Sequence, residues 1–285
     1  SGAGKDGLFE DKKSSYRAYS RMHCSFVFPE KFPRPYPGDL GESDELDEES
    51  RNDILDKQQD PSMIDVMELT EDRKLVIKRY EADKHKVLKK LDKNKHTLFT
   101  MNDPEQLPKY SPKYNSILNK ISTLKGSAFV YTEYKTLEGI AVLKIVLKAN
   151  GYAEFKIGKN EKDELVQVVD NEDIDKPKFA FWGGNEEESD ILRKVFNNEV
   201  DEIPLSLRND LESRGKNNLR GDVIKILLTT KTGAEGIDLH NVRQVHIVEP
   251  YWNPVRTEQV KGRAVRVGSH IKLPPKDRTV EIYTY

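Results

Sequence analysis

From Leu107 onward, short apolar runs alternate along the chain with stretches of helical periodicity. This alternation is typical of βαβ units, in which each helix crosses between two parallel strands. Strands are expected at 127–132, 178–184, 222–230, 242–250 and 278–285. Helices are expected at 111–124, 136–152, 185–197 and 255–266. The sequence therefore predicts an α/β fold with a mostly parallel sheet flanked by helices.

Local signals indicate where some of these helices begin and end. Ser111 can cap the first of them, and Pro112 suits the first helical position because it has no N–H to satisfy. The Asn150-Gly151 pair is expected to end the second. The polar segment 156–178 follows neither period, so we expect an elaboration at an edge of the sheet.

The first 106 residues do not follow this alternation. Four prolines are expected to hold residues 29–37 extended, and the acidic run at 38–60 is expected to be a solvated linker. We therefore divide the chain into two parts. Residues 1–106 are a connector with an acidic linker and a basic amphipathic helical segment, and residues 107–285 are the α/β domain.

The basic segment at 72–96 is rich in lysine and arginine. Its apolar residues recur at helical spacing: Leu75, Val76, Tyr80, Val87, Leu88 and Leu91. Two interpretations of this amphipathic helix stay open. It packs against the α/β domain, or its cationic face lies along the phosphate backbone of a nucleic acid.

Composition excludes several classes of protein. No apolar run approaches the ~20 residues that span a bilayer, and residues 1–10 lack the apolar core of a signal peptide. We therefore expect a soluble intracellular protein with no membrane partner. Cys24 is the only cysteine, which excludes an internal disulfide and any zinc site with two cysteines. The six histidines lack ligand spacing, so no metal site is expected.

The segment after the strand at 222–230 carries a ligand-binding signal. Gly233 and Gly236 allow backbone amides to approach a ligand closely. Thr230 can donate to a phosphate oxygen, and Asp238 can accept from a sugar hydroxyl. Because open parallel sheets bind ligands at the carboxyl ends of their strands, we expect these residues at that edge. Taken alone, such a turn is more often plain structure.

The helix expected at 255–266 strengthens this signal. Gln259, Arg263 and Arg266 are four and three residues apart, so a helix presents them on one side, and Gly262 leaves room there. Apolar residues surround them: Val260, Ala264, Val265 and Val267. We therefore expect a largely buried helix, in which like charges need an anion between them. A triphosphate is such an anion, because guanidinium groups bind phosphoryl oxygens bidentately.

These motifs resemble those of superfamily 2 helicases and translocases. "TTKTGAEGIDL" (229–239) is similar to motif V, and "EQVKGRAVR" (258–266) is similar to motif VI, of the second RecA-like lobe. "EPYWNP" between them resembles a stretch of the Swi/Snf branch, and "FVYTEY" resembles motif IV. Residues 16–37 also resemble the segment that joins the lobes in helicase-like transcription ATPases of large cytoplasmic DNA viruses. The poxvirus early transcription factor small subunit and nucleoside triphosphatase I are of this type.

The resemblance implies a RecA-like helicase C-terminal lobe that uses ATP. It implies that Arg263 and Arg266 contact the γ-phosphate as arginine fingers and that Gln259 positions the attacking water or the phosphate. The residues expected near the nucleotide are Gly236, Asp238 and Gly262.

The resemblance also implies contacts with the backbone of a nucleic acid, with DNA favoured over RNA. The residues that match are Thr132, Gly184, Thr230 and Lys231. Two departures from the family pattern weaken these contacts. Glu235 stands where DEAD-box proteins have arginine, and "FWGG" lacks the usual histidine or aspartate before its last glycine.

Neither a Walker A loop nor a Walker B pair occurs in these 285 residues. We therefore expect the chain to bind ATP weakly and to hydrolyse none by itself, with Mg²⁺ held by a first lobe. The expected partners are that first RecA-like lobe, nucleic acid, and RNA polymerase or other transcription factors. The expected location is a cytoplasmic viral factory or virion if the viral resemblance holds, and the nucleus otherwise.

Two other functions fit parts of the sequence. A non-catalytic module that recruits transcription machinery would use residues 1–106 and the surface of the lobe, but it would not need Gln259, Arg263 and Arg266. A free-standing Rossmann enzyme fits less well, because no G-x-G-x-x-G opens the first helix.

Overall fold

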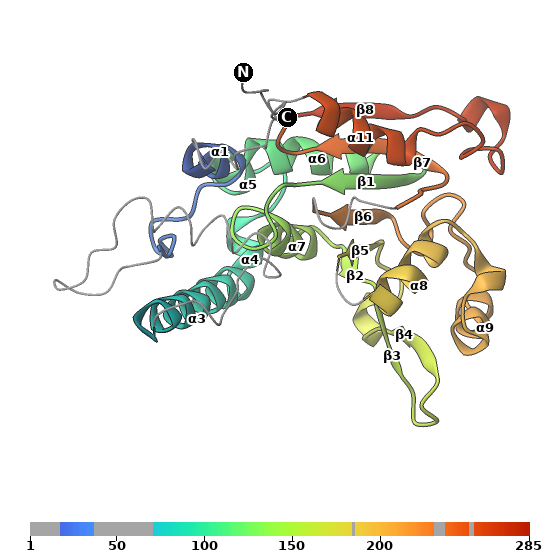
Figure 1. The fold of residues 1–285 in the computed structure, drawn as a ribbon, viewed down its shortest axis with the longest axis horizontal. Helices are drawn as coiled ribbons and strands as arrows, with labels where there is room; N and C mark the ends of the chain where they lie inside the picture. The colour runs from blue at the N-terminus through green and yellow to red at the C-terminus, as the bar shows by residue number, and fades with distance from the viewer. Residues whose placement is uncertain (1–17, 37–70, 184–185, 231–236, 251–253) are drawn as a thin grey trace, which may run out of the picture.

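The computed structural model describes residues 18–36, 71–183, 186–230, 237–250 and 254–285. Among these residues six strands form one sheet in the order β2-β5-β6-β1-β7-β8, and every neighbouring pair is parallel (Figure 1). The strands are β1 (Ser127–Tyr131), β2 (Ala153–Glu154), β5 (Lys178–Trp182), β6 (Ile226–Thr229), β7 (Val242–Ile247) and β8 (Glu281–Thr284). The predicted α/β fold with a mostly parallel sheet is confirmed.

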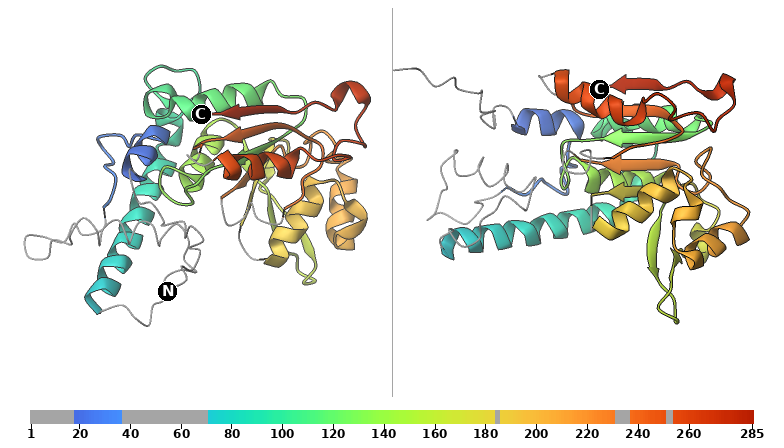
Figure 2. Two further views of the ribbon diagram at one scale, coloured as in Figure 1. Left: turned by 45° about the horizontal axis from the view of Figure 1, so that its top comes forward. Right: turned by 45° about the vertical axis from the view of Figure 1, so that its right-hand side comes forward.

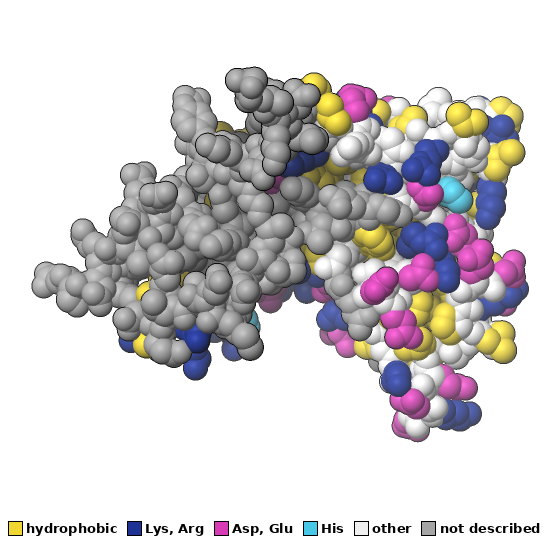
Figure 3. Space-filling view, in the orientation of Figure 1, with side chains coloured by type: hydrophobic (Ala, Val, Ile, Leu, Met, Phe, Trp, Pro, Cys, Tyr) yellow, Lys and Arg dark blue, Asp and Glu magenta, His cyan; other side chains and the backbone are white. Residues whose placement is uncertain are grey.

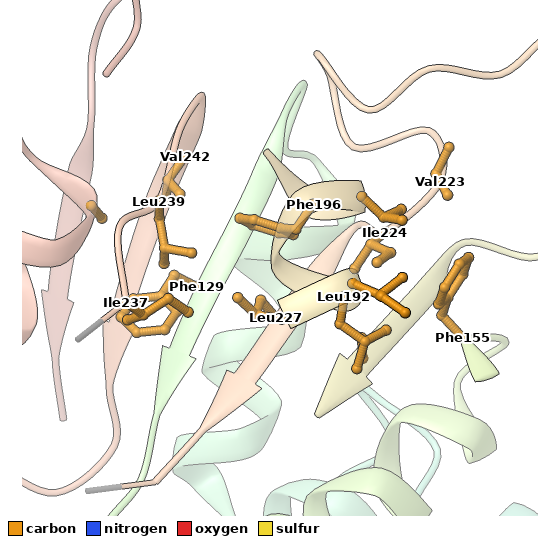
Figure 4. Packing of buried hydrophobic residues seen from close by; sticks show 14 of the residues in the cluster. Phe129, Phe155, Leu192, Phe196, Val223, Ile224, Leu227, Ile237, Leu239 and Val242 are labelled. Atoms are coloured by element: carbon orange, nitrogen blue, oxygen red, sulfur yellow. The ribbon is translucent and has the colours of Figure 1, made fainter. Parts of the chain in front are cut away.

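Helices cover both faces of this sheet, which gives the fold three layers (Figures 1 and 2). The helices of one face include α6 (Pro112–Ser122) and α7 (Ile140–Ala149), and those of the other are α8 (Glu186–Phe196), α9 (Leu205–Ser213) and α11 (Pro254–Ala264). Each layer closes over an apolar cluster. Figure 4 shows the cluster beneath α8, in which Leu192 and Phe196 pack with Phe129 and Leu227 of the sheet. Burying each such side chain is worth ~1.5–3 kcal/mol.

The central strands are mostly apolar and are buried along their whole length because helices cover both of their sides. Every residue of β1 and of β6 is buried. The sequence analysis predicted both strands for that reason, together with β5, β7 and β8. It did not predict β2, because this edge strand has only two residues and shows no period.

The start of α6 follows the predicted signals, whereas α7 starts later than predicted. The Ser111 hydroxyl accepts a hydrogen bond from the Tyr114 N–H at 3.1 Å, which caps α6. The second helix was expected from residue 136, but it begins at Ile140. A Cβ at Gly139 would lie 1.8 Å from the Tyr134 carbonyl oxygen, and Glu138 has φ 57. The chain therefore turns tightly before the helix, at a glycine that no other residue can replace.

The polar segment at 156–178 forms an elaboration at the sheet edge, as expected. It contains an antiparallel hairpin of β3 (Lys156–Lys159) and β4 (Leu165–Val168), directly after the edge strand β2. α9 supports this hairpin, since the Ser206 hydroxyl donates to the Leu165 carbonyl at 2.7 Å. The structure also contains three short 3₁₀ turns: η2 (Asn171–Asp173), η3 (Val200–Glu202) and η4 (Pro275–Asp277).

The described N-terminal residues pack onto the face that carries α6 and α7. They form α1 (Ala18–Ser25), α3 (Glu71–Lys93), α4 (Lys95–Leu98) and α5 (Leu107–Tyr110). Phe26, Leu91 and Phe99 are fully buried in the apolar cluster of that face. The predicted basic helix is therefore present as α3 and packs at least in part against the domain. A division of the chain at residue 106 stays a prediction.

The acidic run at 38–60 lies outside the described residues. In the part of the chain that the structure describes, no helix combines the length and the apolar content that crossing a membrane requires.

Candidate functional site

Four strands end at the same edge of the sheet, because β1, β5, β6 and β7 are parallel. We call this the carboxyl edge, and the arrowheads in Figure 1 point toward it. The residues that follow these strands include Thr132, Gly183, Thr230 and Glu249. Open parallel sheets bind ligands at this edge.

A buried carboxylate, Glu249, organises the carboxyl edge. It accepts hydrogen bonds from the hydroxyl groups of Ser25 at 2.6 Å and Thr132 at 2.8 Å, and from the backbone N–H of Glu133 at 3.0 Å. Burial raises the pKa of Glu249 even though these hydrogen bonds act to lower it. Thr132 is fully buried and its hydroxyl is already committed. In this structure it therefore presents no surface to the nucleic-acid backbone that it was expected to contact.

Thr230 lies at the end of β6, and only 6% of its surface is exposed. The hydroxyl of its neighbour Thr229 donates to the Trp182 carbonyl at 3.0 Å, and the Trp182 indole N–H donates to the Ser189 carbonyl at 2.8 Å. These bonds join β5, β6 and α8 at the edge. Three further predicted site residues lie outside the described residues: Gly184, Lys231 and Gly236.

α11 carries predicted motif VI residues, and it is buried only along a narrow stripe on one side. Val260 and Ala264, one turn apart, are 3% and 0% exposed. Val265 and Val267 are 48% and 108% exposed, so the expectation of a largely buried helix is wrong. The reason is that α11 ends at Ala264 and that residues 265–268 after it are exposed.

The two predicted arginine fingers have different surroundings. Arg263 is partly buried in the last turn of α11, and its guanidinium makes no ion pair or hydrogen bond with any described residue. Arg266 lies beyond the helix and forms an ion pair with Asp238 at 2.5 Å, in which the side chains are 49% and 50% exposed. Both arginines were expected on one face of the helix. For Arg266 this expectation is wrong, because Arg266 lies beyond the end of α11, where it pairs with Asp238.

The other motif VI residues lie on open surface. Gln259 is exposed on α11. A Cβ added at Gly262 would meet no atom of the described residues within 4 Å. Both positions therefore leave space beside Arg263 for a ligand.

The Asp238–Arg263–Arg266 group does not lie at the carboxyl edge, where the sequence argument placed it. α11 follows β7 and runs back along the sheet, so its last turn lies near the start of β7. The Leu239 N–H donates to the Arg263 carbonyl at 3.1 Å, three residues before β7 begins. The 11 residues of α11, ~16 Å of helix, separate this group from the strand ends. The rule that ligands bind where parallel strands end does not place these residues correctly. Residues 237–239 already lead into β7 and do not lie at the end of β6.

A contact that the sequence analysis missed ties the first turn of α11 to the end of β1. Arg256 Nη1 lies 3.4 Å from the Glu133 carboxylate, and the Tyr131 hydroxyl donates to the same carboxylate at 2.8 Å. The Arg256 and Glu133 side chains are 20% and 8% exposed, so solvent screens their attraction only in part. The sequence does place Arg256 two turns before Arg263, on the same side of the helix, and this spacing could have marked Arg256 as part of the site. Nothing in the sequence points to Glu133 as its partner.

Comparison with known families identifies the region that contains α11 and the Asp238–Arg266 pair. Residues 184–268 match the family described as helicase conserved C-terminal domain. This segment is thus similar to helicase C-terminal domains. The resemblance seen in motifs V and VI is therefore confirmed.

Relatives of this chain occur in large DNA viruses. It is 36% identical over 199 residues to a "Termination factor NPH-I homolog" of African swine fever virus, covering 64% of this chain and 27% of the relative. It is 28% identical to "Putative ATP-dependent RNA helicase R350" of Acanthamoeba polyphaga mimivirus, covering 95% of this chain and 33% of the relative. The chain thus spans a quarter to a third of the length of these relatives.

A solved structure, the C-terminal part of the Fun30 ATPase domain, is 15% identical to the chain. It aligns with 74% of this chain and 53% of its own length, at a TM-score of 0.41.

Proposed function

We propose that this chain is the second RecA-like lobe of a nucleic-acid-dependent ATPase of the helicase and translocase type. In this proposal a first lobe, outside the 285 residues, holds ATP and Mg²⁺, and the present lobe closes on it. The lobe then contributes charge to the nucleotide and contacts to a nucleic acid. The helicase C-terminal domain at 184–268 supports this assignment.

The observation that carries the proposal is the state of Arg263. It is a cation on α11 without a partner among the described residues, beside the exposed Gln259. The N–H donors of a guanidinium lie in one plane, so a guanidinium without a protein partner can bind two oxygens of the γ-phosphate of ATP at once. Arg263 is therefore the stronger candidate for the arginine finger. Arg266 would have to exchange Asp238 for phosphate when the lobes close.

Asp238 has a second role in this proposal. As an exposed acceptor next to Arg266, it can receive a hydrogen bond from a ribose hydroxyl, and its ion pair then links the sugar to the residues after α11. The described residues contain no group of three His, Cys, Asp or Glu that could hold a metal ion. Accordingly, the proposal assigns no Mg²⁺ ligand to them.

The test uses the complete two-lobed protein and measures steady-state ATP hydrolysis with nucleic acid present. Arg263→Ala is expected to lower kcat about 10³- to 10⁵-fold, the range for loss of an arginine finger. Arg263→Lys is expected to recover little, because an ammonium cannot bind bidentately. Arg266→Ala is expected to lower kcat as well, because the same closed state uses it.

Arg220→Ala is the matched control. Arg220 is 50% exposed and pairs with Asp277 at 2.9 Å, much as Arg266 pairs with Asp238, but it lies outside the proposed nucleotide group. Its replacement is expected to leave kcat unchanged. A kcat within a few-fold of normal for both Arg263→Ala and Arg266→Ala would instead favour the non-catalytic module that recruits transcription machinery.

A further inference from the structure

α3 carries a one-sided row of cations that the proposed ATPase site does not use. The row consists of Lys78, Arg79, Lys86, Lys89, Lys90 and Lys93, which are all exposed. At 100° per residue all six fall within about a third of the helix circumference. We call this row the cationic face of α3. None of its side chains forms an ion pair or hydrogen bond with a described residue.

The acidic residues of the same helix do not neutralise the cationic face. Glu81 is engaged by Lys84 at 2.7 Å, and Asp92 by Lys95 at 3.4 Å. Among the α3 side chains that the structure describes, Asp83 is the remaining exposed carboxylate, and it lies at the margin of the cationic face. An ordinary solvated helix mixes both signs of charge to limit repulsion between neighbours. Six like charges that have no partner among the described residues instead cost stability that an anion would recover.

The opposite side of α3 fixes its orientation. Val76 is 6% exposed, Tyr80 is 3% exposed and Leu91 is fully buried. The Lys84 ammonium is also buried on this side, 4.8 Å from the centre of the Tyr80 ring. Because this face is held down, the cationic face points outward in a defined direction.

The position of α3 relates the cationic face to the rest of the site. In each view of Figures 1 and 2, α3 extends past the sheet on the side toward which the strand arrowheads point. The carboxyl edge lies on that side. In Figure 3, Lys and Arg side chains emerge where α3 lies, below the residues drawn in grey.

We propose that the cationic face of α3 is a second nucleic-acid contact, which binds the phosphate backbone where the polymer passes the carboxyl edge. From Lys78 to Lys93 the face runs ~22 Å, enough to follow several phosphates of one strand. Lysine ammonium groups on flexible stems neutralise phosphate without reading bases, so this contact is independent of base sequence. The proposal requires neither ATP nor a first lobe.

The test measures binding of the 285-residue chain to a fluorescent single-stranded DNA of about 20 nucleotides, and to the matching duplex, between about 50 and 200 mM salt. The test variant combines Lys86→Gln, Lys89→Gln and Lys93→Gln, because glutamine is as good a helix former as lysine. Circular dichroism checks that α3 is retained. The slope of log Kobs against log salt is expected to fall by about 2 to 3 in magnitude, since each lost contact contributes ~0.7 for single strands and ~0.9 for duplex.

The control variant combines Lys125→Gln, Lys162→Gln and Lys276→Gln. These three lysines are exposed, unpaired with any described residue and outside α3, so net charge changes by the same amount. The control is expected to keep the salt slope of the unmodified chain. An equal fall in the salt slope for both variants would show that the effect depends only on net charge, and it would overturn the proposal.

Three further outcomes would overturn it. They are no change in slope for the α3 variant, no binding of DNA by the unmodified chain, and tighter binding of polyglutamate than of DNA. The last result would assign the cationic face to an acidic protein partner. None of these outcomes bears on Arg263, whose test measures ATP hydrolysis in the two-lobed protein, so the two proposals fail separately.

Discussion

His246 is a buried histidine whose neighbours keep it neutral. Its ring stacks on those of Tyr283 at 5.3 Å and Tyr285 at 5.9 Å. Its Nδ1 lies 2.8 Å from the Tyr285 hydroxyl, and its Nε2 lies 3.1 Å from the Gln244 side-chain oxygen. Burial, with a smaller effect from Lys120, lowers the pKa of His246 from 6.5 to about 4. The residue therefore links β7 and β8 only in its uncharged form.

This shift predicts how the stability of the domain depends on pH. The unfolded chain binds a proton at His246 near pH 6.5, whereas the folded chain does so only near pH 4. The stability from neutral His246 is therefore fully present above pH 6.5 and is lost as pH falls toward 4, by up to about 3 kcal/mol. His246→Gln is expected to lose less stability over this range, as measured by urea unfolding at several pH values. The exposed His85→Gln serves as control, and identical pH profiles for both variants would contradict the prediction.

Single residues also mark how far a sequence can predict this site. Ser111 as a helix cap and Arg263 on a helix were predictable, because caps and helix faces depend on neighbours within a few positions. The pairing of Arg266 with Asp238 was not, since the two are 28 positions apart and only the tertiary fold brings them together. Thr132 carried a motif resemblance, but its burial against Glu249 depends on α1, more than 100 residues earlier.

At the level of elements, a buried ion pair holds the proline-rich segment against the domain. Arg34 and Glu138 lie 2.5 Å apart, with side chains 4% and 0% exposed. The Tyr114 hydroxyl donates to the Glu138 carbonyl, which joins α6 to the same point. The ion pair therefore connects the segment that precedes α3 with the turn before α7.

Removing one partner of this pair is expected to be costly. Arg34→Ala leaves the Glu138 carboxylate buried without its counter-charge, and we expect the free energy of unfolding to fall by about 3–5 kcal/mol. Arg34→Met combined with Glu138→Gln is expected to recover most of that loss. Urea denaturation measures both.

Arg208→Ala provides the comparison, because Arg208 pairs with Asp201 and Glu212 at the surface. Surface pairs contribute about 0–1 kcal/mol. If Arg34→Ala destabilised the chain no more than Arg208→Ala does, the Arg34–Glu138 pair would not anchor the segment.

Elements with a long apolar period were predictable, and those without one were not. β1, α6 and α8 were predicted close to their observed bounds, whereas β6 begins four residues later than predicted. α9 was missed because only Leu207 and Leu211 of its nine residues are buried, which gives a weak signal. The end of α11 was placed two residues too late, because the apolar character of Val265 was taken as burial.

For the whole molecule, the proposed division of labour between two lobes makes one direct prediction. These 285 residues contain no Walker A loop, so the chain is expected to release no phosphate from ATP above the buffer rate, with or without nucleic acid. The complete two-lobed protein, assayed in parallel, is expected to turn over. Turnover by the chain alone, surviving repurification, would show that the first lobe is not needed.

The molecule also separates two surfaces that the sequence argument had merged. Thr132 and Thr230 lie at the carboxyl edge, whereas Asp238, Arg263 and Arg266 lie near the far end of α11. Motif order alone could not reveal this, because a strand and the helix after it return the chain to where it started.

The strand order has a consequence for how the chain acquires its structure. β1 is the first strand along the chain, but it lies in the middle of the sheet and pairs with β6 and β7, which follow about a hundred residues later. Closing loops of that length is slow. One edge of β1 stays open until β6 has been synthesised to residue 229, and the other until β7 has been synthesised to residue 247. During translation, the chain therefore exposes a strand that can aggregate until residues 226–247 have been made.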